Sequence, residues 1–291
     1  MAVPEEQLAL SLGDQSFDLS ERGLVMGILN RTTDSFFDRG AYFELAAFLA
    51  HADGLVSAGA DILDVGGVKA GPGPEVNEQE EMDRVVPAIE ALRRRIDIPL
   101  SVDTWRGSVA RACYAAGAVM GNDISGFADP DYLRVAASAD AAVVATHIRL
   151  APRVGDPDPH YGDLLGAVEA FLRERTDRAL AAGVREDRIV VDAGLDLGKT
   201  WQQSIELLRA SDRFAGLGFP LLLSASNKTF LGSLLGLEVS GRRDASLAAA
   251  ALGLTRGCRI VRVHDVAGTV RVRDVVAAII GAGRDQQMAA R

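Results

Sequence analysis

The fold of this chain is decided by stretches of the kind GADILDV, residues 59–65, in which a glycine follows a helical run and precedes a short apolar run. Residues 42–58 before it carry apolar side chains at the spacing of one helical face. Glycine readily adopts the left-handed backbone that ends a helix. The same order recurs around Gly117, Gly183 and Gly257. Repeated units of this kind predict an α/β protein in which helices alternate with the strands of a parallel sheet.

Eight short apolar runs are the candidate strands, and helical patterns follow them. They lie at residues 24–30, 61–65, 100–103, 119–123, 142–147, 189–192, 220–224 and 260–264. This number favours a single (β/α)8 or TIM barrel of about 250 residues over an open sheet. We therefore expect an N-terminal hairpin or strand at residues 1–22 that covers the bottom of the barrel, the barrel itself at residues 23–283, and a C-terminal tail at residues 284–291.

The composition is that of a globular, acidic protein. Of the 291 residues, 48% are hydrophobic and 24% are charged, which excludes wholesale disorder. A net charge of −9 disfavours nucleic-acid binding. No apolar run reaches membrane-spanning length, and the acidic start MAVPEEQLAL lacks the basic region of a signal peptide. Cys113 and Cys258 form no C-x-x-C pattern, so we interpret them as buried thiols of a cytoplasmic protein.

Polar side chains end nearly every predicted strand. In a barrel, the carboxyl ends of the strands and the loops after them carry the chemistry. Any one such residue is equally well explained as a helix cap or a loop brace. Their convergence at all eight strand ends indicates a polar site for a small molecule. The residues are Asn30, Asp64, Asp103, Asn122, Asp123, His147, Asp192, Ser226, Lys228, Arg262 and His264.

One half of this set suits a flat heterocycle. Asp103, Asn122 and Asp192 supply hydrogen-bond acceptors and one amide, which match the N–H edge of a 2-amino-pyrimidinone ring. A buried carboxylate accepts two parallel N–H bonds there with strong directionality. Lys228 is placed to donate to a carbonyl or imine nitrogen of the same ring.

The other half suits a phosphate or diphosphate. Asn30, Arg262 and His264 combine an amide oxygen, a cation and an imidazole, which together fit a diphosphate and its Mg²⁺. The alternative for Arg262 is a salt bridge to Asp265 or to a helix acid.

These motifs resemble the dihydropteroate synthase family, and the resemblance runs from about residue 24 to residue 282. It is carried by MGILN at 26–30, DSF at 34–36, GADILDVGG at 59–67, SVDT at 101–104, NDISG at 122–126, GKT at 198–200, KTFLG at 228–232 and RVHDV at 262–266. The resemblance implies an enzyme of folate biosynthesis, a transferase that joins a pterin diphosphate to 4-aminobenzoate with loss of diphosphate. It also implies a homodimer.

The resemblance further implies a role for individual residues. It implies that Asp103, Asn122, Asp192 and Lys228, the residues that suit a flat heterocycle, hold the pterin. In the same way Asn30 is expected to meet Mg²⁺, and Arg262 and His264 are expected to meet the diphosphate.

The loops depart from the family pattern. In the first loop, NVTPDSF has become NRTTDSF, which introduces Arg31. In the second loop, GGESTRPG has become GGVKAGPG, which introduces Lys69 and removes an arginine. SRK has become SNK, so that Asn227 replaces another arginine, and DPGxGFGK has become DAGLDLGK. These changes predict a divergent paralogue that is weak or inactive in the standard condensation, or that uses another amine.

Three alternatives remain at this stage. Arg31 and Lys69 could replace the lost cations in a fully active dihydropteroate synthase. A pterin methyl-transfer domain related to corrinoid methyltransferases would have no need of Arg262 and His264, whose presence argues against that class. A non-catalytic pterin-binding protein would bind its ligand tightly and turn over no amine.

Overall fold

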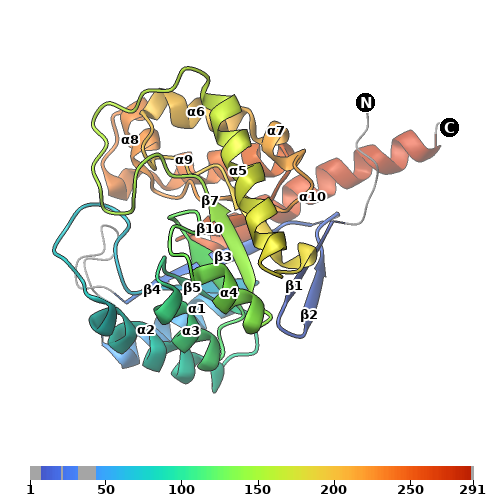
Figure 1. Ribbon diagram of the computed structural model, residues 1–291. Helices are drawn as coiled ribbons and strands as arrows, with labels where there is room; N and C mark the ends of the chain where they lie inside the picture. Colours follow the sequence, from blue (N-terminus) through green and yellow to red (C-terminus); the bar gives the residue numbers. More distant parts are fainter. Residues whose placement is uncertain (1–7, 21, 32–43, 290–291) are drawn as a thin grey trace.

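The computed structural model describes residues 8–20, 22–31 and 44–289, with side chains up to Gly281. Within these ranges, eight parallel strands form a closed barrel in the order β10-β3-β4-β5-β6-β7-β8-β9 (Figure 1). The predicted (β/α)8 barrel is confirmed. The barrel strands are β3 (Leu24–Asn30), β4 (Ile62–Gly66), β5 (Leu100–Asp103), β6 (Met120–Asp123), β7 (Ala142–Thr146), β8 (Ile189–Asp192), β9 (Leu221–Leu223) and β10 (Cys258–Val263).

Helices surround the barrel and connect its strands. Their bounds are α1 (Leu45–Ser57), α2 (Glu78–Arg93), α3 (Gly107–Ala115), α4 (Tyr132–Ser138), α5 (Leu164–Ala181), α6 (Trp201–Arg209), α7 (Ser211–Ala215), α8 (Thr229–Leu235), α9 (Arg243–Thr255) and α10 (Val266–Ala289). The glycines expected to end helices follow α1, α3, α5 and α9 with φ between +92° and +113°. The last helix extends past residue 283, where the sequence suggested a tail.

A short hairpin closes the bottom of the barrel, as expected. Strands β1 (Ala9–Leu12) and β2 (Gln15–Asp18) pair antiparallel. Leu10, Leu12 and Leu19 are buried in one cluster with residues near the start of the barrel strands, including Met26 and Ile62. Figure 1 shows the hairpin on the side of the barrel opposite the long loops after β4 and β7.

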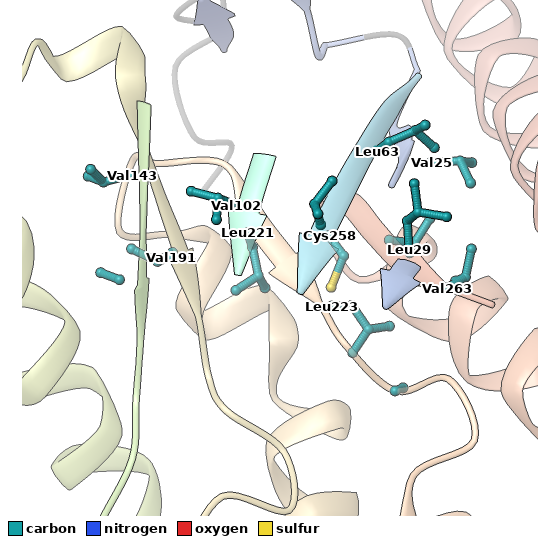
Figure 2. Packing of buried hydrophobic residues seen from close by; sticks show 14 of the residues in the cluster. Val25, Leu29, Leu63, Val102, Val143, Val191, Leu221, Leu223, Cys258 and Val263 are labelled. Atoms are coloured by element: carbon teal, nitrogen blue, oxygen red, sulfur yellow. The ribbon is translucent and has the colours of Figure 1, made fainter. Parts of the chain in front are cut away.

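Alternating residues give the barrel strands two different faces. The outward residues pack against the helices in a continuous apolar cluster, part of which Figure 2 shows with Val25, Leu63 and Val191. On most strands the inward residues are apolar near the start and polar near the end, whereas both inward residues of β5, Ser101 and Asp103, are polar. Thus β3 carries Met26 and later Asn30 inward. The barrel therefore has an apolar lower interior and a polar upper interior at the carboxyl ends of its strands.

In the part of the chain that the structure describes, no helix is long and apolar enough to cross a membrane. Cys113 and Cys258 are both buried free thiols.

Candidate active site

A cavity of about 580 Å³ opens at the carboxyl ends of the strands. The loops after β4, β7, β8 and β9 form most of its wall. Six of the residues singled out from the sequence line it, namely Asn30, Lys69, Asp103, Asn227, Lys228 and Arg262. The sequence analysis therefore located the cavity correctly, although Asn122, Asp192 and His264 are not among the described residues of its wall.

The floor of the cavity is a network centred on Asp64. Its carboxylate is fully buried and accepts hydrogen bonds from Ser101 Oγ at 2.6 Å and Asn122 Nδ2 at 3.0 Å. Arg262 donates through Nε to Asp64 Oδ2 at 2.5 Å and through Nη2 to Asp103 Oδ2 at 2.7 Å. Asn122 and Arg262 are thus joined through Asp64, and Asp103 joins the network through Arg262.

The charge of Arg262 is accordingly balanced inside the barrel. Two carboxylates, Asp64 and Asp103, face one guanidinium, whereas Asp265 pairs with Arg243 at 2.8 Å. The proposed salt bridge of Arg262 to Asp265 is therefore incorrect. Burial raises the pKa of Asp103, and the neighbouring guanidinium counteracts this shift.

Asp192 and Lys228 are held by the loop after β8. Asp192 Oδ1 accepts the backbone N–H of Gly194 at 2.7 Å, and Lys228 Nζ donates to the carbonyl oxygen of Leu195 at 2.6 Å. Burial raises the pKa of Asp192 and lowers that of Lys228, and the attraction between the two groups opposes both shifts. The pair is therefore electrostatically linked across the loop.

A buried lysine that was not predicted as a site residue organises the same loop. Lys199 Nζ lies 2.7 Å from His147 Nδ1 and donates to the carbonyl oxygens of Gly194 at 2.7 Å and Leu197 at 3.1 Å. Burial and this amino group lower the pKa of His147 to about 3, so the imidazole is neutral at physiological pH. Lys199 precedes Thr200, which is the N-cap of α6.

Asp196 adds a carboxylate where the family pattern has glycine, but hydrogen bonds occupy both of its oxygens. Oδ1 accepts Ser204 Oγ at 3.1 Å, and Oδ2 accepts the backbone N–H of Phe230 at 3.1 Å. Its φ of 65° lies in the left-handed region that aspartate tolerates. The residue therefore braces the loop after β8 against α8.

His264 stands at the edge of the site. Its Nδ1 lies 3.0 Å from Ser226 Oγ, and its backbone N–H donates to the same hydroxyl at 3.2 Å. Burial and the charge of Arg262 lower its pKa to about 3. His264 lines a second pocket of about 210 Å³, which shares Asn227 and Val239 with the main cavity.

The altered-loop residues have different surroundings. Arg31 Nη1 donates to the carbonyl oxygen of Arg84 at 2.7 Å, and Arg31 is absent from the described cavity wall. Lys69 lines the cavity. Asn227 is buried at φ 57°, and its N–H donates to Ser246 Oγ at 2.9 Å. Thr33, the other change in the first loop, lies outside the described residues.

Asn30 offers one oxygen ligand to a metal. Its Oδ1 would lie 3.0 Å from a Cβ added to Gly66, so the glycine leaves room for the amide. Among the described residues there is no cluster of three or more His, Cys, Asp or Glu side chains that could hold a metal. Mg²⁺ needs six oxygen ligands and takes many of them from phosphate and water. Asn30 therefore fits a Mg²⁺ that arrives with a diphosphate.

Comparison with known proteins places this geometry in a family. A family model described as pterin binding enzyme matches residues 26–264. The inactive dihydropteroate synthase 2 of Mycobacterium leprae is 45% identical over 268 residues, 90% of this chain and 92% of that protein. This chain belongs to the dihydropteroate synthase family. The dihydropteroate synthase of Bacillus subtilis is 40% identical over 265 residues, 90% of each chain. The crystal structure of the Yersinia pestis dihydropteroate synthase with a sulfonamide drug superimposes with a TM-score of 0.91 at 38% identity, and the match covers 94% of this chain and 100% of that chain.

Within this dihydropteroate synthase fold, sequence reasoning missed residues that hold the site residues in position by hydrogen bonds. Asp64 was noted as a strand-end residue without a role, and Ser101 was not singled out. Ser101 lies two residues before Asp103 on β5, so the two-residue period of a strand was the available signal for this residue. Lys199 lies in the GKT motif at 198–200, but its contacts depend on the path of its loop and could not be read from that motif.

Proposed function

We propose that this chain binds a pterin in the upper barrel through Asp103, Asn122, Asp192 and Lys228. The observation that carries the proposal is the Asp64 network, which holds Asn122 and Asp103 in place beside Arg262. Pre-organised acceptors of this kind suit the N–H edge of a flat heterocycle because their orientation is already fixed before binding. The cavity volume of about 580 Å³ lies within the range of small-molecule sites.

Arg262, His264 and Asn30 are the proposed contacts of the pterin diphosphate. Arg262 and His264 would bind its oxyanions, and Asn30 would bind an accompanying Mg²⁺. The metal would neutralise negative charge on the departing diphosphate. By holding the metal, Asn30 would keep the diphosphate close to Arg262, which lines the same cavity.

The standard condensation is proposed to be weak or absent, or to take a different amine acceptor. Two observations favour this. The family's arginines of the second loop and of the SRK motif are Gly71 and Asn227 here, and the guanidinium of Arg31 donates to the carbonyl oxygen of Arg84. Charge developing on diphosphate therefore finds fewer cations in these loops than the family pattern supplies, and electrostatic stabilisation of this kind is commonly a large part of catalysis.

A homodimer and a cytoplasmic location complete the proposal. The described part of α10 exposes apolar side chains, with Val275 at 58%, Ile279 at 68% and Ile280 at 36% exposure. An apolar patch of this kind suits an interface between two copies. The buried thiols Cys113 and Cys258 are typical of a reducing compartment.

The test is a turnover assay of the full chain with 6-hydroxymethyl-7,8-dihydropterin diphosphate, 4-aminobenzoate and Mg²⁺, which measures diphosphate and dihydropteroate separately. We expect pterin binding with little or no dihydropteroate. Diphosphate without dihydropteroate would support a different amine acceptor. Both products at a rate of about 1 s⁻¹ or more would refute the weak-turnover proposal. Failure to bind any pterin would refute the function as a whole.

A further inference from the structure

The wall of the cavity contains more cationic than acidic side chains, and Asp64 and Asp192 behind it also face Arg262 and Lys228. The wall contains six cationic side chains, Lys69, Arg153, Lys199, Lys228, Arg242 and Arg262, and three acidic ones, Asp103, Asp156 and Asp196. The chain as a whole has a net charge of −9, so this concentration of cations is local. A concave surface of one sign attracts ligands of the opposite sign.

Each of the three carboxylates already has a partner. Asp103 pairs with Arg262 at 2.7 Å, and Asp156 pairs with Arg149, whose Nη2 lies 2.9 Å from Asp156 Oδ1. Asp196 accepts hydrogen bonds from α8 and from Ser204. None of the three forms a salt bridge with Arg153 or Arg242 among the interactions of the described residues.

Arg242 is held rigidly by backbone atoms. Its Nε donates to the carbonyl oxygen of Leu237 at 3.1 Å, and its Nη1 donates to that of Asn227 at 2.9 Å. The guanidinium packs against Gly232, where an added Cβ would approach Nη2 to 2.5 Å. These contacts fix the side chain and leave further N–H donors on Nη1 and Nη2. A fixed guanidinium loses little conformational entropy when an oxyanion binds to it.

Arg153 is placed in a similar way on another loop. Its Nη1 donates to the carbonyl oxygen of Lys69 at 3.3 Å, its Nη2 contacts that of Pro74, and its backbone N–H donates to that of Ala70 at 3.0 Å. The residue thus ties the loop after β7 to the loop after β4. Its guanidinium lies beside the stretch in which this chain has Ala70 and Gly71.

We propose that Arg242 and Arg153 form an oxyanion-binding part of this cavity. The ligand group is a carboxylate of the amine acceptor or the diphosphate of the pterin, which share this chemistry. The inference rests on the proposed function because it concerns the same cavity. It differs in placing the anion at two guanidinium groups that form no salt bridge with a carboxylate of the described residues, rather than only at Arg262 and His264.

The experiment is isothermal titration of the full chain with inorganic diphosphate, 4-aminobenzoate and the uncharged 4-aminobenzamide, for the wild type, Arg242→Gln and Arg153→Gln. The control is Arg209→Gln, which removes the same charge from an exposed position on α6 outside the cavity wall. We expect each cavity variant to weaken binding of at least one anion about tenfold or more, because a charge-assisted hydrogen bond is lost. The control should leave all affinities within about twofold.

The two anions identify the source of the oxyanion. Weakened diphosphate binding assigns the pair to the pterin diphosphate, and weakened 4-aminobenzoate binding with unchanged 4-aminobenzamide binding assigns it to the acceptor. Unchanged affinity for both anions, or no binding of either to the wild type, would overturn the inference. The variant Arg242→Lys keeps the positive charge but loses the guanidinium hydrogen bonds to the backbone, so it distinguishes the two roles of Arg242. Recovery of anion binding supports the proposal, whereas equal losses for Lys and Gln, with matching falls in Tm, would show a structural brace only.

Pterin titration of the same variants keeps the two proposals apart. A protein that binds pterin but shows no effect of Arg242 and Arg153 on anions retains the proposed function and loses this inference. A protein that binds anions through these arginines but binds no pterin loses the proposed function and retains this inference.

Discussion

Arg262 Nη2 donates to Asp103 Oδ2 at 2.7 Å, although 159 positions separate the two residues in the chain. The contact exists because β10 pairs with β3 and closes the barrel. Closure brings Arg262 on the last strand to the carboxylate of Asp103 on β5, so the floor of the cavity forms only when the barrel closes. The same guanidinium reaches Asp64, so its loss would affect two carboxylates.

Substitution Arg262→Gln is expected to lower the free energy of unfolding by about 3–5 kcal/mol, because it leaves buried carboxylates without their cation. Urea unfolding at pH 7 measures the change. Adding Asp103→Asn should restore part of the loss, since one unpaired carboxylate is removed. The exposed Arg271→Gln serves as the control and should stay within about 0.5 kcal/mol of the wild type. A loss below about 1 kcal/mol for Arg262→Gln would show that the pair is solvated.

Substitution Lys199→Met is expected to destabilise the protein by at least about 2 kcal/mol, because carbonyl oxygens of Gly194 and Leu197 lose their donor. Pterin affinity should fall as well, since the same loop positions Lys228. Urea unfolding and pterin titration report the two effects. Lys69→Met removes a lysine from the same cavity wall and should change stability by about 0.5 kcal/mol or less. Equal stability of the two variants would contradict the bracing role.

His264 makes the stability depend on pH. Its pKa of about 3 in the folded chain lies below the value of about 6.5 expected when unfolded, so only the unfolded chain takes up this proton between these pH values. Its contribution is therefore lost as pH falls from about 6.5 toward 3. Between pH 7 and pH 5, wild type should lose about 2 kcal/mol more than His264→Gln, as measured by urea unfolding. Parallel losses would mean that the imidazole is protonated in the folded protein.

Gly121 on β6 leaves space for the buried Tyr132 and the partly buried Tyr114. A Cβ added there would lie 2.2 Å from Tyr114 Oη and 2.4 Å from Tyr132 Oη. Gly121→Ala should therefore destabilise the chain by about 1–3 kcal/mol through overpacking. Gly54→Ala in α1, where nothing lies within 4 Å, should instead stabilise it by about 0.5–1 kcal/mol. Thermal unfolding of both variants gives the comparison, and a neutral Gly121→Ala would refute the close fit.

Periodic features of the sequence predicted the barrel, while individual contacts required the structure. Glycines after helices and polar strand ends are local signals, and both correctly indicated the architecture and the position of the cavity. The pairing of Arg262 with Asp64 and Asp103 depends on barrel closure, which no local spacing encodes. The positions of Arg242 and Lys199 depend on loop conformations for the same reason. Arg31 lies in an altered loop, but its guanidinium contacts Arg84.

The hairpin beneath the barrel places part of the apolar core at the end opposite the cavity. Leu10, Leu12 and Leu19 fill the apolar end, and none of them lines the cavity at the polar end. Packing of the hairpin against the barrel therefore involves none of the cavity residues in the loops after β4 or β9. Loops from a catalytically active relative can be transplanted onto this chain one at a time, with the barrel as an unchanged support, to learn which loop restores turnover.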